Sequence, residues 1–173
     1  FFHIGSPNDL PEIFETELQG LVNTAGQSVM LTLTPLAGAK VTDVLNDFET
    51  HPDGSLKLPN LMMGNPLEIV VRLQIPALAQ ATEVLQASAQ WQETQKATQR
   101  SLSNTLSMPT VSPEQMSDFP ADPAVQEQVA LLMAARARRE AIEFFDQGNA
   151  AKAASVLQKS GEMLRQMPLS APA

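Results

Sequence analysis

The sequence predicts a mixed α+β chain, with an antiparallel β-sandwich flanked by an N-terminal helix and a C-terminal α-helical hairpin. Apolar residues recur at spacings of three and four from Leu10 to Val22, which is typical of one helix face. From Gln27 to Met108 the period changes to two, and turn residues separate the short alternating runs. Helix-forming residues return after the Pro-rich stretch 109–120 and are interrupted at Gly148-Asn149.

The N-terminal segment favours a strand that runs into a capped helix. An apolar start, Phe1 to Ile4, changes directly to Gly5-Ser6-Pro7-Asn8-Asp9, which offers several N-cap oxygens before Pro11. The helix from Pro11 to Val22 then needs an apolar partner, and the three large apolar residues before it are too few to supply one. We therefore expect residues 1–25 to be the remnant of a domain that continues upstream.

The alternating runs between residues 26 and 111 predict the sandwich. The strongest alternation lies in 67–75, and turn chemistry at His51-Pro52-Asp53-Gly54 predicts a hairpin. The expected strands are 27–34, 39–45, 55–61, 67–75, 83–91 and 101–108. Several short strands with turns between them are typical of an antiparallel sandwich.

The last third of the chain predicts a connector, 112–121, a helical hairpin, 122–167, and a frayed tail, 168–173. Asp122 is a good N-cap residue and Pro123 suits the first helical position. Gly148-Asn149 predicts the turn between two antiparallel helices. The residues expected to face the core are Val125, Val129, Leu132, Ala135 or Arg136, Ile142 and Phe145 in the first helix, and Ala153, Val156, Leu157, Met163 and Leu164 in the second.

Composition excludes several function classes. A formal net charge of −8 argues against nucleic-acid binding, because phosphate contacts need a basic surface. The chain has no Cys, so it has no disulfide framework and no thiolate chemistry, which is consistent with a reducing, cytoplasmic setting. No apolar run approaches the ~20 residues of a membrane-spanning helix, and we expect no direct membrane insertion.

No residue of this chain is predicted to be catalytic, cofactor-binding or metal-ligating. His3 and His51 have no nucleophile or second ligand nearby, and Asp43, Asp47 and Glu49 are interpreted as a solvated edge. The chain is therefore not expected to be an enzyme.

The candidate partner-binding residues are Arg136, Arg138, Arg139, Met62 and Met63. The arginines are either a salt-bridged helix face, with Arg139 pairing with Glu143, or a docking patch for an acidic partner. The two methionines either fill the core or form an adaptable apolar contact.

Three stretches resemble bacterial proteins with a von Willebrand factor A (VWA) domain and a calcium-activated chloride-channel-like layout. Residues 4–11 are similar to the end of the last core strand of that domain, and 14–21 to its exit helix. The stretch from Val129 to Ala141 resembles the helical tail of such proteins. The resemblance implies that this chain is the C-terminal portion of a VWA protein.

The metal site of that family uses an Asp-x-Ser-x-Ser motif, which this sequence lacks. The nearest string, from Asp53 to Lys57, has Lys in place of the second Ser. No metal residue can be carried over, so a Mg²⁺ site would belong to the portion upstream of this chain.

The C-terminal hairpin also resembles one tetratricopeptide-type unit, in its small residues, its Gly turn and the Ala-Leu pattern of its second helix. One such unit cannot bury its own face. We therefore expect a non-enzymatic protein–protein interaction or scaffolding module; the alternative is a structural subunit of a larger assembly with no metal-regulated ligand.

Overall fold

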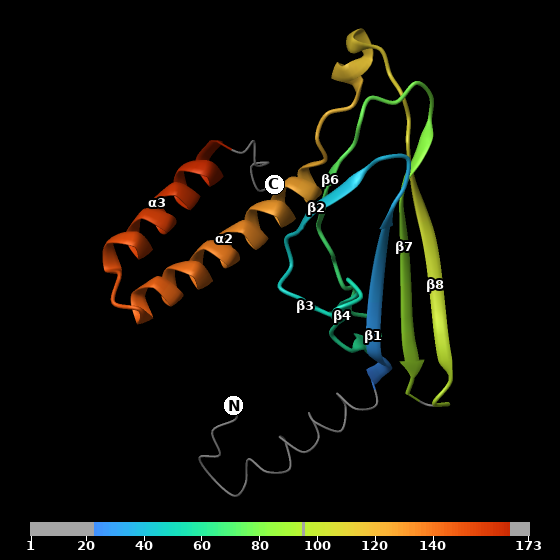
Figure 1. The fold of residues 1–173 in the computed structure, drawn as a ribbon, viewed down its shortest axis with the longest axis horizontal. Coiled ribbons are helices and arrows are strands. Elements are labelled where there is room, and N and C mark those ends of the chain that lie inside the picture. Colours follow the sequence, from blue (N-terminus) through green and yellow to red (C-terminus); the bar gives the residue numbers. More distant parts are fainter. Residues whose placement is uncertain (1–22, 95, 167–173) are drawn as a thin grey trace, which may run out of the picture. The chain divides into compact units, whose positions relative to one another are not determined.

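The computed structural model describes residues 23–94 and 96–166. Its elements are β1 (Thr24–Pro35), β2 (Lys40–Val44), β3 (Glu49–Thr50), β4 (Leu56–Leu58), β5 (Leu61–Met62), β6 (Val71–Gln74), β7 (Thr82–Glu93), β8 (Gln99–Met108), the 3-10 helix η2 (Pro113–Asp118), and the helices α2 (Pro123–Asp146) and α3 (Ala150–Gln166) (Figure 1). The class is α+β, as predicted. The predicted N-terminal strand and helix and the predicted tail 168–173 lie outside the described residues.

The described residues group into two compact units. The first draws on residues within 1–34, 48–68 and 85–106, and the second on residues within 35–47, 69–84 and 107–173. The domain boundaries and the sandwich packing inferred from the sequence remain predictions. No helix of the described residues is both long and apolar enough to cross a membrane.

The first unit contains most of a six-stranded sheet with the strand order β3-β4-β1-β7-β8, in which β5 also pairs with β1. Strands β1 and β4 are antiparallel, and Val29 stands opposite Leu58 and Leu31 opposite Leu56. All four side chains are buried. The predicted alternation of β1 is therefore confirmed, and one face of that strand forms the core.

The second unit contains a two-stranded antiparallel sheet, β2-β6, and the helical hairpin. The pairing of β2 with β6 shifts by one residue between Val41 and Asp43, which leaves Thr42 as a β-bulge. The observed β6 is shorter than the predicted strand 67–75. Its ladder ends at Val70, because the amide of Asn46 accepts the Val70 N–H at 2.8 Å.

Local chemistry sets the ends of the two helices as the sequence predicts. The Asp122 carboxylate accepts the Ala124 N–H at 2.8 Å, and Asn149 Oδ1 accepts the Lys152 N–H at 3.1 Å. At the C-terminus of α2, Gly148 has φ +77° and donates to Phe145 O, while Asn149 donates to Phe144 O. These two bonds are a Schellman motif, which reverses the chain into α3.

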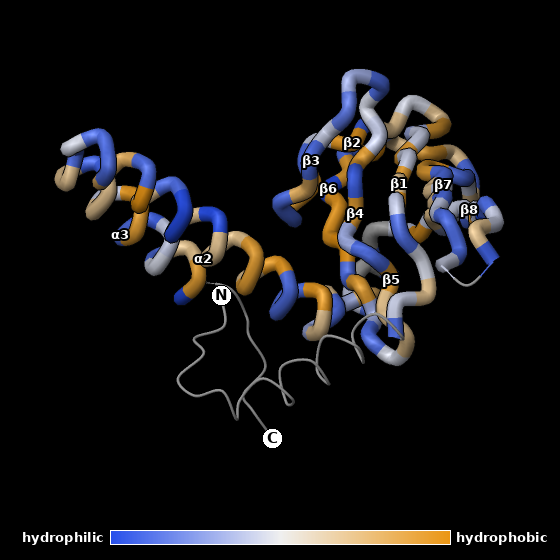
Figure 2. Tube along the Cα trace, turned by 90° about the horizontal axis from the view of Figure 1, so that it is seen from below, coloured by the Kyte–Doolittle hydropathy of each residue, from blue (hydrophilic) through white to orange (hydrophobic). Residues whose placement is uncertain are grey.

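The helices pack through small residues, and the predicted core stripe is wrong for five of its large residues, while four others are half-buried. Ala130, Ala137, Ala141 and Ala153 are buried, whereas several large residues predicted to face the core are exposed; these are Val125, Ile142, Phe145, Leu157 and Met163. Alanine lets two helix backbones approach closely, which moves larger neighbours to the rim of the contact. Figure 2 shows hydrophobic segments recurring along both helices.

Candidate interaction surface on the helical hairpin

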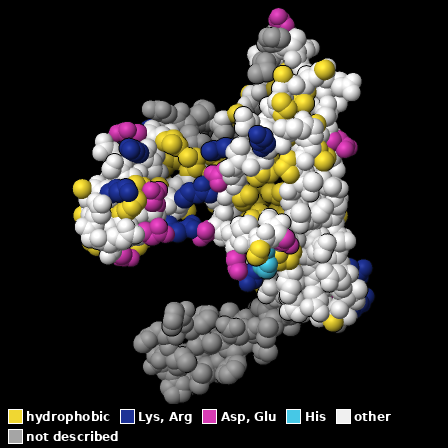
Figure 3. Space-filling view, viewed as in Figure 1, with side chains coloured by type: hydrophobic (Ala, Val, Ile, Leu, Met, Phe, Trp, Pro, Cys, Tyr) yellow, Lys and Arg dark blue, Asp and Glu magenta, His cyan; other side chains and the backbone are white. Residues whose placement is uncertain are grey.

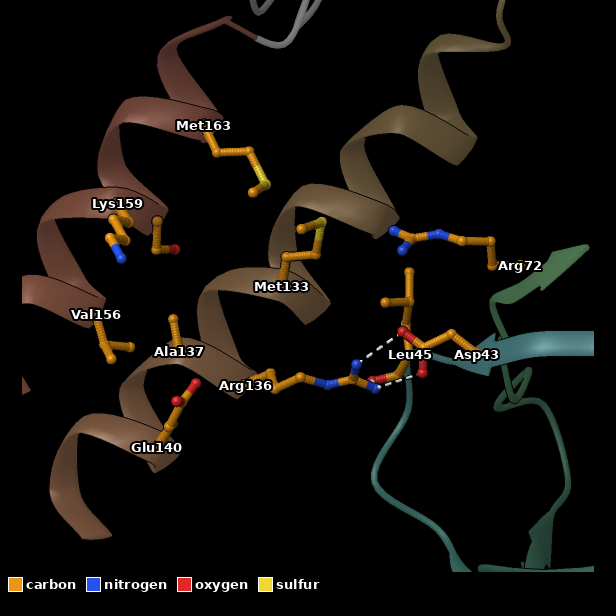
Figure 4. Close-up of a pocket in the computed structure, with 11 residues that line it drawn as sticks. Asp43, Leu45, Arg72, Met133, Arg136, Ala137, Glu140, Val156, Lys159 and Met163 are labelled. Atoms are coloured by element: carbon orange, nitrogen blue, oxygen red, sulfur yellow. Dashed lines mark hydrogen bonds and ion pairs between the residues drawn. The ribbon is translucent and has the colours of Figure 1, made fainter. Parts of the chain in front are cut away.

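Arg136 of α2 joins the hairpin to the end of β2. Its guanidinium donates to both carboxylate oxygens of Asp43, at 2.8 and 3.2 Å. It also donates to the carbonyls of Val44 at 2.8 Å and Leu45 at 3.3 Å. Figure 4 shows the Arg136 side chain extending from α2 to Asp43. We call these four bonds the arginine clamp; they use the planar, multi-donor geometry that distinguishes arginine from lysine.

The β2-β6 sheet places Asp43 for this bond. Asp43 follows the bulge at Thr42 and stands opposite Arg72 of β6. Its side chain is 27% exposed and is engaged by Arg136 of α2. The interpretation of Asp43 as a solvated edge residue is therefore wrong. Its partner lies 93 residues away in the sequence, where no local pattern points to it.

The clamp lowers the pKa of the Asp43 carboxyl below its ordinary value of 3.8, mainly through the hydrogen bond from Arg136 and further through the charges of Arg136 and Arg72. A carboxyl with a lowered folded-state pKa contributes stability that is complete above its unfolded pKa and is lost as pH falls through the folded value. We expect the clamp to weaken only below pH 3.8. An NMR titration of the Asp43 carboxyl should show this pKa rise toward its ordinary value in Arg136→Ala; an unchanged midpoint would contradict the assignment.

Arg139 makes a second ion pair on the same side, with Asp47, in place of the predicted pair with Glu143. The Asp47 side chain is exposed, so this pair adds little to stability. Glu49, the third acid of the predicted edge, is also exposed and pairs with Lys57 at 3.0 Å. The two outer acids are thus exposed as predicted, but each has a basic partner.

A cavity of about 350 Å³ lies beside the clamp (Figure 4). Its wall combines the cations Arg72 and Lys159 with the apolar side chains of Met133, Val156 and Met163. Among the described residues, no group of three or more His, Cys, Asp or Glu side chains is arranged to hold a metal ion. The side of α2 that lines this cavity therefore carries both charged and apolar side chains, and Arg136 and Asp43 of the clamp form part of the wall.

The other side of α2 forms an open apolar groove with α3. It has a volume of about 360 Å³ and is lined by Arg138, Ala141, Ile142, Phe145, Ala153 and Leu157. Ile142 and Phe145 are 60% and 67% exposed. Figure 3 shows hydrophobic side chains lying between charged ones on the hairpin. We call these six residues the apolar groove.

Arg138 differs from its two neighbours in the basic cluster. Arg136 and Arg139 are engaged by Asp43 and Asp47, whereas Arg138 has no ion-pair partner among the residues that the structure describes. The structure therefore divides the predicted patch into two structural arginines and one available at the edge of the apolar groove. Sequence reasoning missed this division, because it depends on which residues lie beside each face of α2.

The two candidate methionines lie in the first unit. Met62 is in β5, is half-buried, and its sulfur accepts the hydroxyl of Thr24 at 3.4 Å. Met63 is largely exposed and lies directly after that strand. Met62 thus belongs to the sheet packing, whereas Met63 is exposed beside it. His51, in the predicted turn, is half-buried.

No protein-family profile matches the sequence, and no curated protein does. The chain is similar to the crystal structure of the ArnB paralog VWA2 from Sulfolobus acidocaldarius, with a TM-score of 0.48 and 17% identity over 96% of this chain. This chain spans 41% of the length of that protein.

Proposed function

We propose that this chain is a non-enzymatic protein–protein interaction module, and that the α2-α3 hairpin is its binding surface. The observation that carries the proposal is the apolar groove with Arg138, which has no ion-pair partner among the described residues, at its edge. Three large apolar side chains, Ile142, Phe145 and Leu157, remain substantially exposed around a floor of Ala141 and Ala153. Contiguous apolar surface rimmed by polar groups is typical of interaction sites.

We propose that the occupant of the apolar groove is an α-helix. The alanines at its floor let a third helix approach closely, while Phe145 and Leu157 form its walls. A helix that lays an apolar face into such a groove uses side chains one turn apart as anchors. The exposed aromatic ring of Phe145 is the strongest anchor, because aromatic residues dominate binding energy at interfaces.

The proposed chemistry of that partner helix follows from charge complementarity. Arg138 lines the apolar groove and has no ion-pair partner among the described residues, so it can receive a carboxylate from an incoming helix. A bidentate arginine–carboxylate pair supplies orientation as well as energy. The partner is therefore an amphipathic helix with an acidic residue beside its apolar stripe.

The arginine clamp prepares this surface for binding. Arg136 and Arg139 attach α2 to residues 43–47, on the side of the helix away from the apolar groove. A surface that is held in its bound conformation before association loses less entropy on binding. The clamp and the groove are thus two parts of one arrangement, one that positions α2 and one that binds.

A peptide-display selection with the full chain tests the proposal. The probe is a library of amphipathic helical peptides with a constant leucine face and randomised flanking charges. We expect the wild-type chain to enrich peptides with acidic flanks, and Arg138→Glu to enrich basic ones. Phe145→Ser should weaken binding of a selected acidic peptide by about tenfold or more.

Lys159→Glu is the matched control, because it makes the same change of charge on the cavity side of the hairpin. It should leave the peptide affinity unchanged. Selection of the same peptides by wild-type and Arg138→Glu chains would remove the charge argument. Peptides that bind equally well to Phe145→Ser would remove the apolar groove itself as the site.

The finer assignment, also proposed here, is that the chain is the C-terminal part of a VWA-type protein whose metal-dependent ligand site lies upstream. The supporting observations are the sequence resemblances of 4–11, 14–21 and 129–141. The alternative is a structural subunit with no metal-regulated ligand. Peptide mapping of the natural polypeptide separates the two: an upstream Asp-x-Ser-x-Ser favours the first, and a degenerate motif or a mass of 18.7 kDa favours the second.

A further inference from the structure

Strand β8 forms one end of the six-stranded sheet and has a neighbour, β7, on one side. Among the described residues no strand pairs with its other side. Natural edge strands are usually protected by charges, prolines or short length. This strand has ten residues, QRSLSNTLSM, with one charged residue and no proline. Its outer edge is therefore open to a further strand.

The contacts of β8 with β7 show which backbone groups point outward. The Glu93 N–H donates to Thr98 O at 2.8 Å, and Ser88 Oγ lies 2.8 Å from Ser103 Oγ in the same register. Successive residues of a strand direct their backbone groups to opposite sides. The residues that share the direction of Thr98 bond to β7, so the outward groups belong to Ser101, Ser103, Thr105 and Ser107.

The Thr105 N–H provides an independent check of this direction. It donates to the side chain of Asn104, at 2.9 Å from Oδ1, and so it is not engaged by β7. In an isolated chain, the side chain of Asn104 thus accepts one of the outward N–H groups, that of Thr105. The donor would be released when another strand offers a carbonyl.

The leucine side chains of β8 are also exposed to solvent. Leu102 and Leu106 lie on one face and are 65% and 45% exposed. On the neighbouring strand β7, by contrast, Leu85 is buried. The apolar face of the sheet therefore extends onto β8, where none of the described residues buries it.

The sequence of this strand is a near-palindrome about Asn104. Residues 101–107 are Ser-Leu-Ser-Asn-Thr-Leu-Ser, and the same order reads backwards apart from an exchange of Ser for Thr. We infer that β8 pairs antiparallel with β8 of a second copy of this chain, about a two-fold axis at Asn104. An isologous interface brings the same patch of each copy together, and a palindromic strand meets this condition.

The outward backbone groups agree with this register. Ser101 pairs with Ser107 of the second copy and Ser103 with Thr105, so the four outward residues make the inter-chain hydrogen bonds. Leu102 then lies beside Leu106 of the second copy in a non-hydrogen-bonded pair, where side chains approach most closely. Arg100 stands opposite Met108 and is already paired with Glu93 at 3.0 Å, so no like charges meet.

Substitution of Asn104 tests the axis, because it is the one position of 101–107 that meets itself. Sedimentation of the wild-type chain should show a concentration-dependent species of twice 18.7 kDa. Asn104→Lys opposes two ammonium groups and should weaken this dimer by about tenfold. Asn104→Asp alone should do the same, whereas an equimolar mixture of the two variants should recover the dimer. Gln90→Lys, an exposed position of β7, is the control of equal charge.

Each outcome decides the inference. Recovery in the mixture establishes that position 104 faces itself across the axis, which a general loss of folding does not produce. A chain that is monomeric at every concentration overturns the inference. A dimer that tolerates Asn104→Lys as well as it tolerates Gln90→Lys uses another surface and overturns it too, and the edge would then serve a strand of a different protein.

Discussion

Replacing Arg136 with alanine is expected to lower the free energy of unfolding of the second unit by about 1–3 kcal/mol. The substitution removes four hydrogen bonds, two to the Asp43 carboxylate and two to the carbonyls of Val44 and Leu45. Leu45 is itself buried, so water replaces the lost bond to its carbonyl poorly. Partial exposure of the guanidinium keeps the loss below that of a fully buried ion pair.

The neighbouring arginine supplies a matched control. Arg138 is on the same helix but has no ion-pair partner among the described residues, so Arg138→Ala should change stability by less than about 0.5 kcal/mol. Arg136→Lys should fall between the two, because lysine keeps the charge and loses the bidentate geometry. Urea unfolding followed by amide exchange in β2 and α2 measures each effect.

A double-mutant cycle with Asp43→Asn isolates the pair itself. Residues in one hydrogen-bond network show coupling of about 0.5–3 kcal/mol. Equal losses in Arg136→Ala and Arg138→Ala, or additive effects of Arg136→Ala and Asp43→Asn, would show that the clamp does not hold α2.

The parts of the fold that the sequence predicted well depend on short-range chemistry. Asp122 caps α2 by bonding a residue two positions along, and Gly148 ends it because glycine readily adopts a positive φ. The alternation in β1 likewise reports one buried face, as the burial of Val29 and Leu31 confirms. Each of these signals can be found within a window of a few residues.

The features of the fold and site that the sequence did not predict depend on partners distant in the chain. Asp43 and Arg136 are joined across 93 positions, and nothing near either residue indicates the other. Ile142 and Phe145 follow a regular apolar pattern, but that pattern does not distinguish a face that packs from one that awaits a partner. The smaller alanines are buried between the helices instead, so the large apolar side chains remain exposed and form the apolar groove. The interaction surface could therefore be located on the hairpin, while its exact residues required the structure.

Strand β8 is another case in which the sequence predicts the element but not its surroundings. Its alternation of Leu102, Asn104 and Leu106 with hydroxyl residues correctly indicated a strand. Whether the leucine face is covered depends on what lies across from it, and both leucines are largely exposed. A palindrome is visible in the sequence, but it gains meaning only once the strand is known to be at the edge of a sheet.

Replacing Gly26 with alanine is expected to destabilise the six-stranded sheet by about 1–3 kcal/mol, although it adds a single methyl group. Gly26 is buried in β1, at an irregular point in the pairing with β5. An added Cβ would lie 3.1 Å from Cγ of Trp91 in β7 and still closer to Cδ1. Both atoms belong to the rigid indole ring, so relief requires a shift of the whole side chain. Glycine within a strand often marks such a close approach.

The same substitution in α3 should have the opposite sign. Gly161 is helical, and a Cβ there meets nothing within 4 Å, so Gly161→Ala should stabilise the hairpin by about 0.5–1 kcal/mol through helix propensity. Trp91 is the one tryptophan of the chain, and its fluorescence reports the sheet during urea unfolding. A loss of stability in Gly26→Ala with an altered Trp91 emission, beside a gain in Gly161→Ala, would establish that the two glycines serve different ends. At Gly26 the indole ring of Trp91 occupies the space that a side chain would need. At Gly161 no neighbouring atom prevents a side chain. If Gly26→Ala were as stable as the wild-type chain, Trp91 could not lie against β1 as the structure places it.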